Sequence, residues 1–150
     1  MFRGRVWHTV FCGAPGDGWT GPPGRDSNEW RGNDFSDAEL VDVDFRDIDL
    51  GAQRWPTDAD EYALIDRVDE RTAEATAAIR DAPAGSWPDP LLAAQAVDFV
   101  RTGRPRDPKG FVLIRRRELG HRLPPQVRDR LWALLVTAYS NDQEQAPAPR

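Results

Sequence analysis

The chain has 150 residues, of which 39% are hydrophobic and 30% are charged, and its formal net charge is −5. This length suits one domain with a modest core, and no apolar run is long enough to cross a bilayer. The N-terminal residues lack the order of a secretory signal, and the single Cys12 excludes an intramolecular disulfide framework, so we expect a cytoplasmic protein.

Charge is unevenly distributed along the chain. Residues 33–50 carry seven acidic side chains against Arg46 alone, whereas residues 101–130 carry ten lysines and arginines against three acids. We interpret this segregation as internal complementarity, in which the basic segment packs beside the acidic one. The alternative is a nucleic-acid site on the basic segment. The overall negative charge and the absence of a recognised binding motif make that alternative the weaker one.

The most regular feature of the sequence is a large apolar residue at every fifth position between residues 30 and 55. An acid directly precedes each of the four central ones. A period of five matches neither the 3.6 of a helix nor the 2 of a strand, so another backbone path must bring these side chains into one interior. The six centres are Trp30, Phe35, Leu40, Phe45, Leu50 and Trp55.

Written in fives as NDFSD, AELVD, VDFRD and IDLGA, this stretch resembles the pentapeptide-repeat family. The resemblance implies a short right-handed quadrilateral β-helix, in which each centre and the residue two before it point inward. Val43 and Ile48 are larger than the family's usual alanine at that second position, and Asn33 is polar there. We interpret the departures as the widening end of a short solenoid.

The N-terminal residues fit the same unit loosely. GRVWH and TVFCG place Val6 and Phe11 as centres, and a stretch rich in glycine and proline at 13–27 then interrupts the register. We therefore expect about two coils over residues 1–56, with the 13–27 segment as an inserted loop. Pro56 ends the repeat because proline cannot donate a backbone hydrogen bond.

We expect residues 57–140 to form a helical region with one short strand. "EYALID" favours an edge strand or the first turn of a helix, and a helical pattern with Asp66 as its cap follows up to Pro83. A clearer helix has Asp89 at the N-cap, Pro90 at the first position and Gly103 just past the end. Its predicted apolar face consists of Leu91, Leu92, Ala96, Phe99 and Val100.

The remaining elements are a short strand over 111–115 and a last helix after Pro125, with Val127, Leu131 and Leu135 at helical spacing. Residues 141–150 read as a disordered tail. We expect the helices to close the open end of the solenoid. The predicted fold class is thus α+β, a short β-helix capped by C-terminal α-helices, and this layout also resembles a group of short bacterial pentapeptide-repeat proteins to which no activity is attached.

The sequence shows no arrangement typical of catalysis, a metal site or a cofactor site. His8 and Cys12 are close in the chain but most readily explained as structural, and the acids between 42 and 49 lack the layout of a calcium loop. The glycines of the loop do not lead into a helix, as a phosphate-binding loop requires. The residues we consider for partner contacts are Trp19, Arg115, Arg116 and Arg117.

We therefore expect a non-catalytic scaffold or protein-interaction module of the pentapeptide-repeat type, acting as a monomer or homodimer. Its partner is expected to be another protein rather than nucleic acid or a membrane. The alternative is an acidic mimic of DNA that modulates a type II topoisomerase or another nucleic-acid-binding protein, as some pentapeptide-repeat proteins do. Two coils would span only about 10 Å at the usual spacing of strands, which is short for a mimic of duplex DNA.

Overall fold

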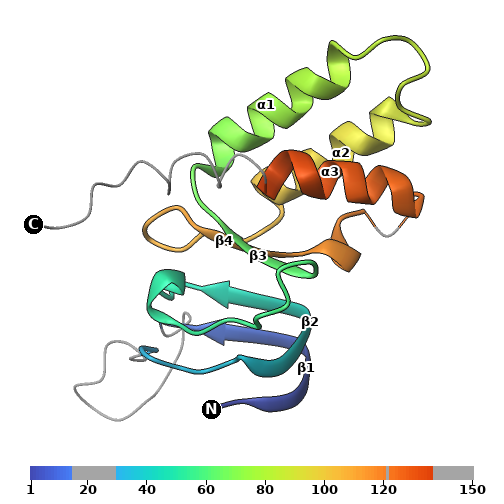
Figure 1. Cartoon of the computed structure of the whole chain (residues 1–150). Coiled ribbons are helices and arrows are strands. Elements are labelled where there is room, and N and C mark those ends of the chain that lie inside the picture. The colour runs from blue at the N-terminus through green and yellow to red at the C-terminus, as the bar shows by residue number, and fades with distance from the viewer. Residues whose placement is uncertain (15–29, 121, 137–150) are drawn as a thin grey trace, which may run out of the picture.

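The computed structural model describes residues 1–14, 30–120 and 122–136. These residues form two two-stranded sheets, three α-helices and two short 3₁₀ helices. The first sheet lies at one end of the molecule, the helices lie at the other, and the second sheet separates them (Figure 1). Trp19, most of the 13–27 loop and the 141–150 tail lie outside the described residues.

The first sheet pairs β1 (Arg3–Cys12) with β2 (Asp37–Arg46) in parallel. The register sets Phe11 against Phe45, so the loosely fitting N-terminal units are in phase with the regular ones. His8 and Asp42 occupy equivalent places in the two strands, and their φ angles of 47° and 50° are both positive. Because positive φ interrupts an extended strand, both strands bend at the same point.

The expected quadrilateral β-helix is wrong. In the described part of residues 1–56 only β1 and β2 form a ladder, and beyond them the backbone makes one isolated bridge, between Asp34 and Arg54. After β2 the chain enters the 3₁₀ helix η1 (Leu50–Ala52) rather than another paired side. A solenoid gains stability from each new unit that stacks on the last, and one strand pair offers no further rung on which to build.

The inward orientation of the repeat residues is nevertheless confirmed by their burial. Phe35, Leu40, Phe45 and Leu50 are all buried, while Trp30 and Trp55 pack partly buried against the same cluster. The residues two places before three of the centres are buried as well, namely Ala38, Val43 and Ile48. The period of five therefore marks one face of an irregular strand-and-turn segment, and this face forms the N-terminal core.

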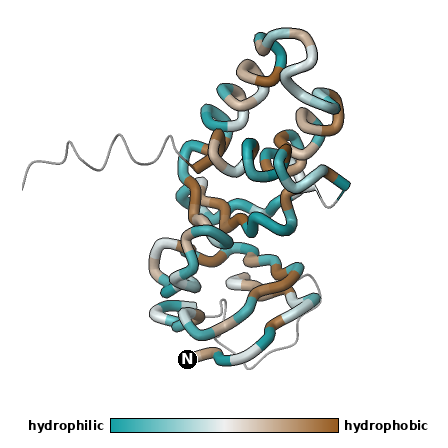
Figure 2. The backbone as a smooth tube through the Cα atoms, turned by 45° about the vertical axis from the view of Figure 1, so that its right-hand side comes forward, coloured by the Kyte–Doolittle hydropathy of each residue, from teal (hydrophilic) through white to brown (hydrophobic). Residues whose placement is uncertain are grey.

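The second sheet is an antiparallel ribbon of β3 (Tyr62–Ile65) and β4 (Val112–Arg115). Of the two alternatives for "EYALID" the edge strand is confirmed, so the second half of the chain contains two strands where the domain prediction had one. Successive side chains of a strand point to opposite faces. Tyr62 and Leu113 accordingly join the N-terminal core, whereas Ile65 and Ile114 join the core beneath the helices. Much of this middle layer is brown in Figure 2, the colour of hydrophobic residues. The ribbon thus belongs to both cores.

The helices cover the other face of the ribbon. They are α1 (Val68–Arg80), α2 (Pro90–Thr102) and α3 (Pro125–Val136). The capping of α2 is confirmed, because the Asp89 side chain accepts a hydrogen bond from the Leu92 backbone N–H at 2.8 Å. The predicted Asp66 cap is wrong. Arg67 takes the N-cap position with positive φ, and Asp66 instead accepts a 2.6 Å hydrogen bond from the buried Arg71 guanidinium.

The predicted apolar face of α2 is partly wrong. Leu91 is 69% exposed and Phe99 is 51% exposed, although both were expected to be buried. The buried side of the helix consists of its smaller residues Ala93, Ala96, Val97 and Val100. Both sets have helical spacing, so periodicity alone does not distinguish them. Packing beside α1 selects the side with small residues and leaves two large apolar residues in solvent.

Candidate functional site

The three arginines considered for partner contacts do not form one site. Arg115 is buried, with its side chain 9% exposed, and donates hydrogen bonds to Glu61 at 2.7 Å and Glu39 at 2.9 Å. Arg116 forms an ion pair with Asp129 at 2.7 Å. Arg117 lies 3.4 Å from the Glu61 carboxylate. Arg115 therefore ties the ribbon to β2, and its role is structural.

Other cations of the basic segment also pair with the acidic one. The Lys109 ammonium donates to Asp49 at 2.8 Å, and the Arg104 guanidinium lies 3.9 Å from Asp44. These contacts confirm the interpretation that the two charged segments complement each other. The hydrogen bond from Arg115 holds the pKa of Glu39 below its usual value, and the bond from Lys109 does the same for Asp49.

Further acids of this segment lie beside basic side chains of β1. Arg3 lies 3.6 Å from Asp37, and Arg5 lies 3.7 Å from Glu39. His8 Nδ1 is 2.6 Å from a carboxylate oxygen of Asp42. A surface that imitates duplex DNA needs a row of uncompensated negative charge. The pairing removes much of that charge from β2.

The outer edge of β1 is the most distinctive surface of the N-terminal half. Within the described part of the chain, β2 is the only strand beside β1, which lies at the end of the molecule farthest from the helices (Figure 1). Trp7 is 61% exposed, and Val10 is also exposed. We call this region the β1 edge surface and define it by Arg3, Arg5, Trp7, His8 and Val10.

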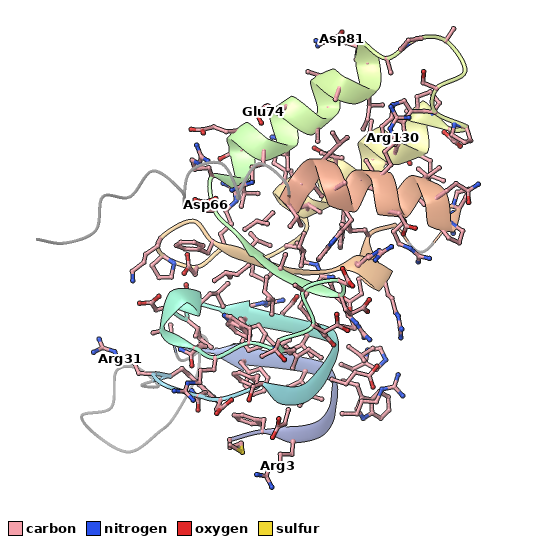
Figure 3. The ribbon with its side chains drawn as sticks, viewed as in Figure 1. Arg3, Arg31, Asp66, Glu74, Asp81 and Arg130 are labelled. Carbon is pink, nitrogen blue, oxygen red and sulfur yellow. The ribbon has the colours of Figure 1, made fainter. Side chains whose placement is uncertain are left out.

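The charged side chains of the β1 edge surface are all cationic or titratable to a cation. Arg3 and Arg5 are both exposed. Arg3 lies at the outer end of the sheet, beside the N-terminus (Figure 3). Ion pairs between exposed side chains contribute little to stability. The ion pairs of Arg3 and Arg5 with β2 therefore add little to the stability of the fold.

The partly buried core continues to this edge. Phe2 stacks on the buried Phe35 with ring centroids 4.5 Å apart, and Val6 packs against the same cluster. Both are only half-buried. A segment that covered the edge of β1 would remove more of these apolar groups from water, which is the main source of favourable free energy in association.

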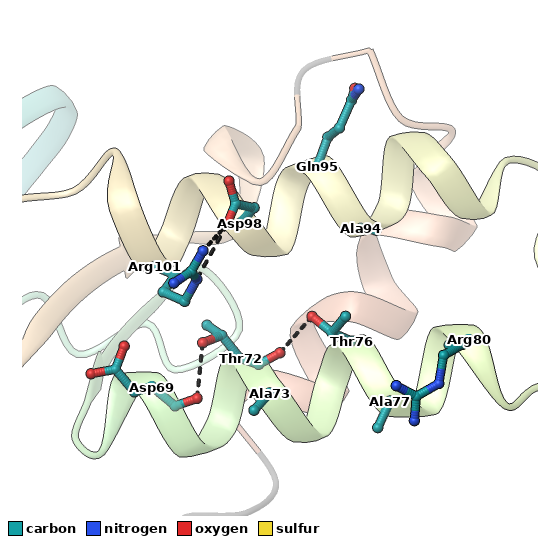
Figure 4. Close-up of a pocket in the computed structure, with 10 residues that line it drawn as sticks. All are labelled: Asp69, Thr72, Ala73, Thr76, Ala77, Arg80, Ala94, Gln95, Asp98 and Arg101. Carbon is teal, nitrogen blue, oxygen red and sulfur yellow. Dashed lines mark hydrogen bonds and ion pairs between the residues drawn. The ribbon is translucent and has the colours of Figure 1, made fainter.

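One groove of the described surface lies between two helices. This open groove of about 660 Å³ runs between α1 and α2 and is lined by Ala73, Ala77 and Ala94, with charged side chains at its ends (Figure 4). Its two acids are both paired: Asp98 accepts a 2.6 Å hydrogen bond from Arg101, and Asp69 accepts 2.7 Å hydrogen bonds from Arg106. A catalytic acid or base needs a convergent partner and room for a substrate atom. This groove offers alanines, two threonines and acids that are already paired with arginines.

Among the residues that the structure describes, no three His, Cys, Asp or Glu side chains are grouped so that they could hold a metal ion. His8 points to Asp42, and Cys12 is half-buried and accepts a hydrogen bond from Trp30 Nε1 at its backbone oxygen. His121 and Trp19 lie outside the described part. In that same part, no helix is long and apolar enough to span a membrane.

Sequence reasoning missed the β1 edge surface although a signal for it was present. In the register that makes Val6 and Phe11 centres, Trp7 and Val10 fall at outward positions. Large apolar residues at outward positions are candidates for contacts with a partner.

Comparison with known proteins adds no assignment. No family model, no curated protein and no solved structure matches the chain. The resemblance to the pentapeptide-repeat family therefore rests on the residue pattern between 30 and 55 and on the layout of the chain.

Proposed function

We propose that this protein is a non-catalytic interaction module of the cytoplasm and that it binds another protein through the β1 edge surface. The observation that carries the proposal is the outer edge of β1, which has no neighbouring strand in the described residues while Trp7 is largely exposed beside it. An unpaired edge presents backbone N–H and C=O groups to which an extended segment can add as a new strand.

The rest of the fold supports this role by holding the edge in place. The strand is backed by stacked and edge-to-face aromatic rings, including Phe11 on Phe45 at 5.1 Å between centroids. The β2 strand behind it is fastened to the ribbon through Arg115. A recognition strand on a rigid support loses little conformational entropy when it binds.

The alternative of a DNA mimic receives no support from the arrangement of charge. Asp37 and Glu39 lie beside arginines, and Asp42 lies beside the His8 imidazole. We therefore do not propose it. A gyrase supercoiling assay distinguishes the two roles, because an interaction module of this kind leaves supercoiling unchanged at micromolar protein, whereas a mimic inhibits it.

Site-specific photo-crosslinking in the native cells tests the proposed surface. Trp7→p-benzoylphenylalanine places the reactive group on the β1 edge surface, and Glu74→p-benzoylphenylalanine places it on the exposed side of α1 as a matched control. We expect a discrete adduct from position 7 that contains one reproducible protein identified by mass spectrometry, and none from position 74. The same adducts from both positions, or none from position 7, would contradict the proposal.

A further inference from the structure

We propose that the segment that binds the β1 edge surface is acidic, extended and parallel to β1, with carboxylates spaced as Asp37, Glu39 and Asp42 are in β2. This inference rests on the proposed function and adds the chemistry of the partner. The required pattern is acid, any residue, acid, any two residues, aspartate. The β2 strand supplies the template for it.

The template follows from the register of the existing sheet. Arg3 is the partner of Asp37 and Arg5 is the partner of Glu39 in the ladder, and in both pairs the side chains form the ion pair that the register allows. His8 faces Asp42 in the same way at the bend. The inner edge of β1 thus already recognises three acids at this spacing.

A third strand on the outer edge meets the same cations. Neighbouring strands lie about 4.8 Å apart, so its side chains in register would stand beside Arg3, Arg5 and His8 on the side away from β2. The Nε atom of Arg3 lies 3.6 Å from the Asp37 carboxylate, and that of Arg5 lies 3.7 Å from the Glu39 carboxylate. Both distances are too long for a hydrogen bond. A guanidinium has five N–H donors, so each arginine can serve a second acid.

The bend in β1 adds a further requirement. His8 has φ of 47°, and β2 follows this bend because Asp42 adopts φ of 50°. Aspartate, asparagine and glycine adopt positive φ more readily than other residues. The third acid of the partner segment is therefore an aspartate rather than a glutamate, since it must both pair with His8 and follow the bend.

A second copy of the chain does not meet these requirements through its own β1. The ten residues of β1, RGRVWHTVFC, contain no acid, so no register of β1 against β1 brings a carboxylate to Arg3 or Arg5. Cations on an edge strand also discourage pairing of like edges. In the acidic β2 of a second copy, one edge pairs with β1, and the Leu40 and Asp42 backbone N–H groups already donate to Tyr62 and Glu118. The charges thus favour a different protein.

The chain itself provides the probe for a test. A fluorescein-labelled peptide with the sequence SDAELVDVDFR, residues 36–46, carries the required acids at the required spacing. The control peptide SNAQLVNVNFR has the same shape with amides in place of the acids. Fluorescence anisotropy with the full chain is expected to show micromolar binding of the acidic peptide, about tenfold tighter than the control at low salt.

Two protein variants assign the binding to the edge. In Arg3→Gln/Arg5→Gln the advantage of the acidic peptide over the control peptide is expected to fall below about twofold. Arg80→Gln, which removes an exposed arginine paired with Asp81 on α1, is expected to leave that advantage unchanged. Circular dichroism verifies that both variants fold, which we expect because the removed ion pairs are exposed.

The outcomes separate this inference from the proposed function. Equal binding of the two peptides, or no binding of either, overturns the acidic partner, while a specific crosslink from position 7 would still support the interaction module. Absence of a specific crosslink from position 7 overturns both the acidic partner and the proposed interaction module. Displacement of the peptide by an oligothymidylate at lower concentration than by unlabelled peptide also overturns the inference, because the cations would then serve nucleic acid.

Discussion

Removing the Phe35 ring empties the centre of the N-terminal core. Phe35 is 1% exposed, and four aromatic rings surround it with centroids between 4.5 and 5.6 Å away. Phe→Ala in a core costs about 3–5 kcal/mol of unfolding free energy. Each well-placed aromatic pair contributes about 0.5–1.5 kcal/mol beyond its buried area, so Phe35→Ala is expected in the upper half of that range.

Urea unfolding followed by tryptophan fluorescence and by far-UV circular dichroism measures the loss. Phe99→Ala is the matched control, because the same ring is removed from a site that is half in solvent, and its cost is expected to stay near 1 kcal/mol or below. Phe35→Leu keeps the measurement possible if the alanine variant does not fold. Equal losses for Phe35→Ala and Phe99→Ala would refute the assignment of Phe35 to the core.

The remaining predictions concern charge and capping. Arg115→Met leaves the nearly buried Glu61 without its main partner and is expected to lower the free energy of unfolding in urea by about 2–3 kcal/mol. This loss is smaller than the loss from breaking a fully buried ion pair, because Arg117 lies near Glu61. A loss below about 0.5 kcal/mol would contradict this role of Arg115. The folded-state pKa of Glu39 is lowered, so its contribution is present above the unfolded value of about 4.5 and lost as pH falls through the folded value. The stability difference between wild type and Glu39→Gln should accordingly shrink between about pH 5 and pH 3, and a constant difference over that range would refute the linkage. Asp89→Ala removes the cap of α2 and is expected to cost about 1 kcal/mol, whereas Asp89→Asn should cost less; equal losses would count against the cap.

The charge pattern has two separate uses in this fold. Arg115 and Lys109 bind acids of the N-terminal half from the second half of the chain, and so hold the layers together. Arg3 and Arg5 are also paired, but both are exposed, on a strand whose outer edge has no neighbouring strand among the described residues. Arg115 and Lys109 stabilise the molecule, and we propose that Arg3 and Arg5 select its partner.

Local signals in the sequence were sufficient wherever the structure depends on a few neighbouring residues. The helix α2 begins and ends where Asp89, Pro90 and Gly103 predicted, because capping and the fixed φ of proline act within one turn. The period of five correctly identified inward residues such as Phe35 and Phe45, because a repeated apolar position must be buried whatever path the backbone takes. It did not determine that path.

Only the tertiary structure decided features that depend on distant residues. The period of five suggested a closed coil, but strand pairing is set by long-range contacts, and in the described part of residues 1–56 the only ladder joins β1 and β2. Arg115 is buried and Arg117 exposed two positions later, because Glu61 and Glu39 approach from elsewhere in the chain. The sequence by itself determined which residues of the five-residue period avoid water and where α2 begins. Packing between distant segments decided the architecture and, among the described residues, left the outer edge of β1 without a neighbouring strand.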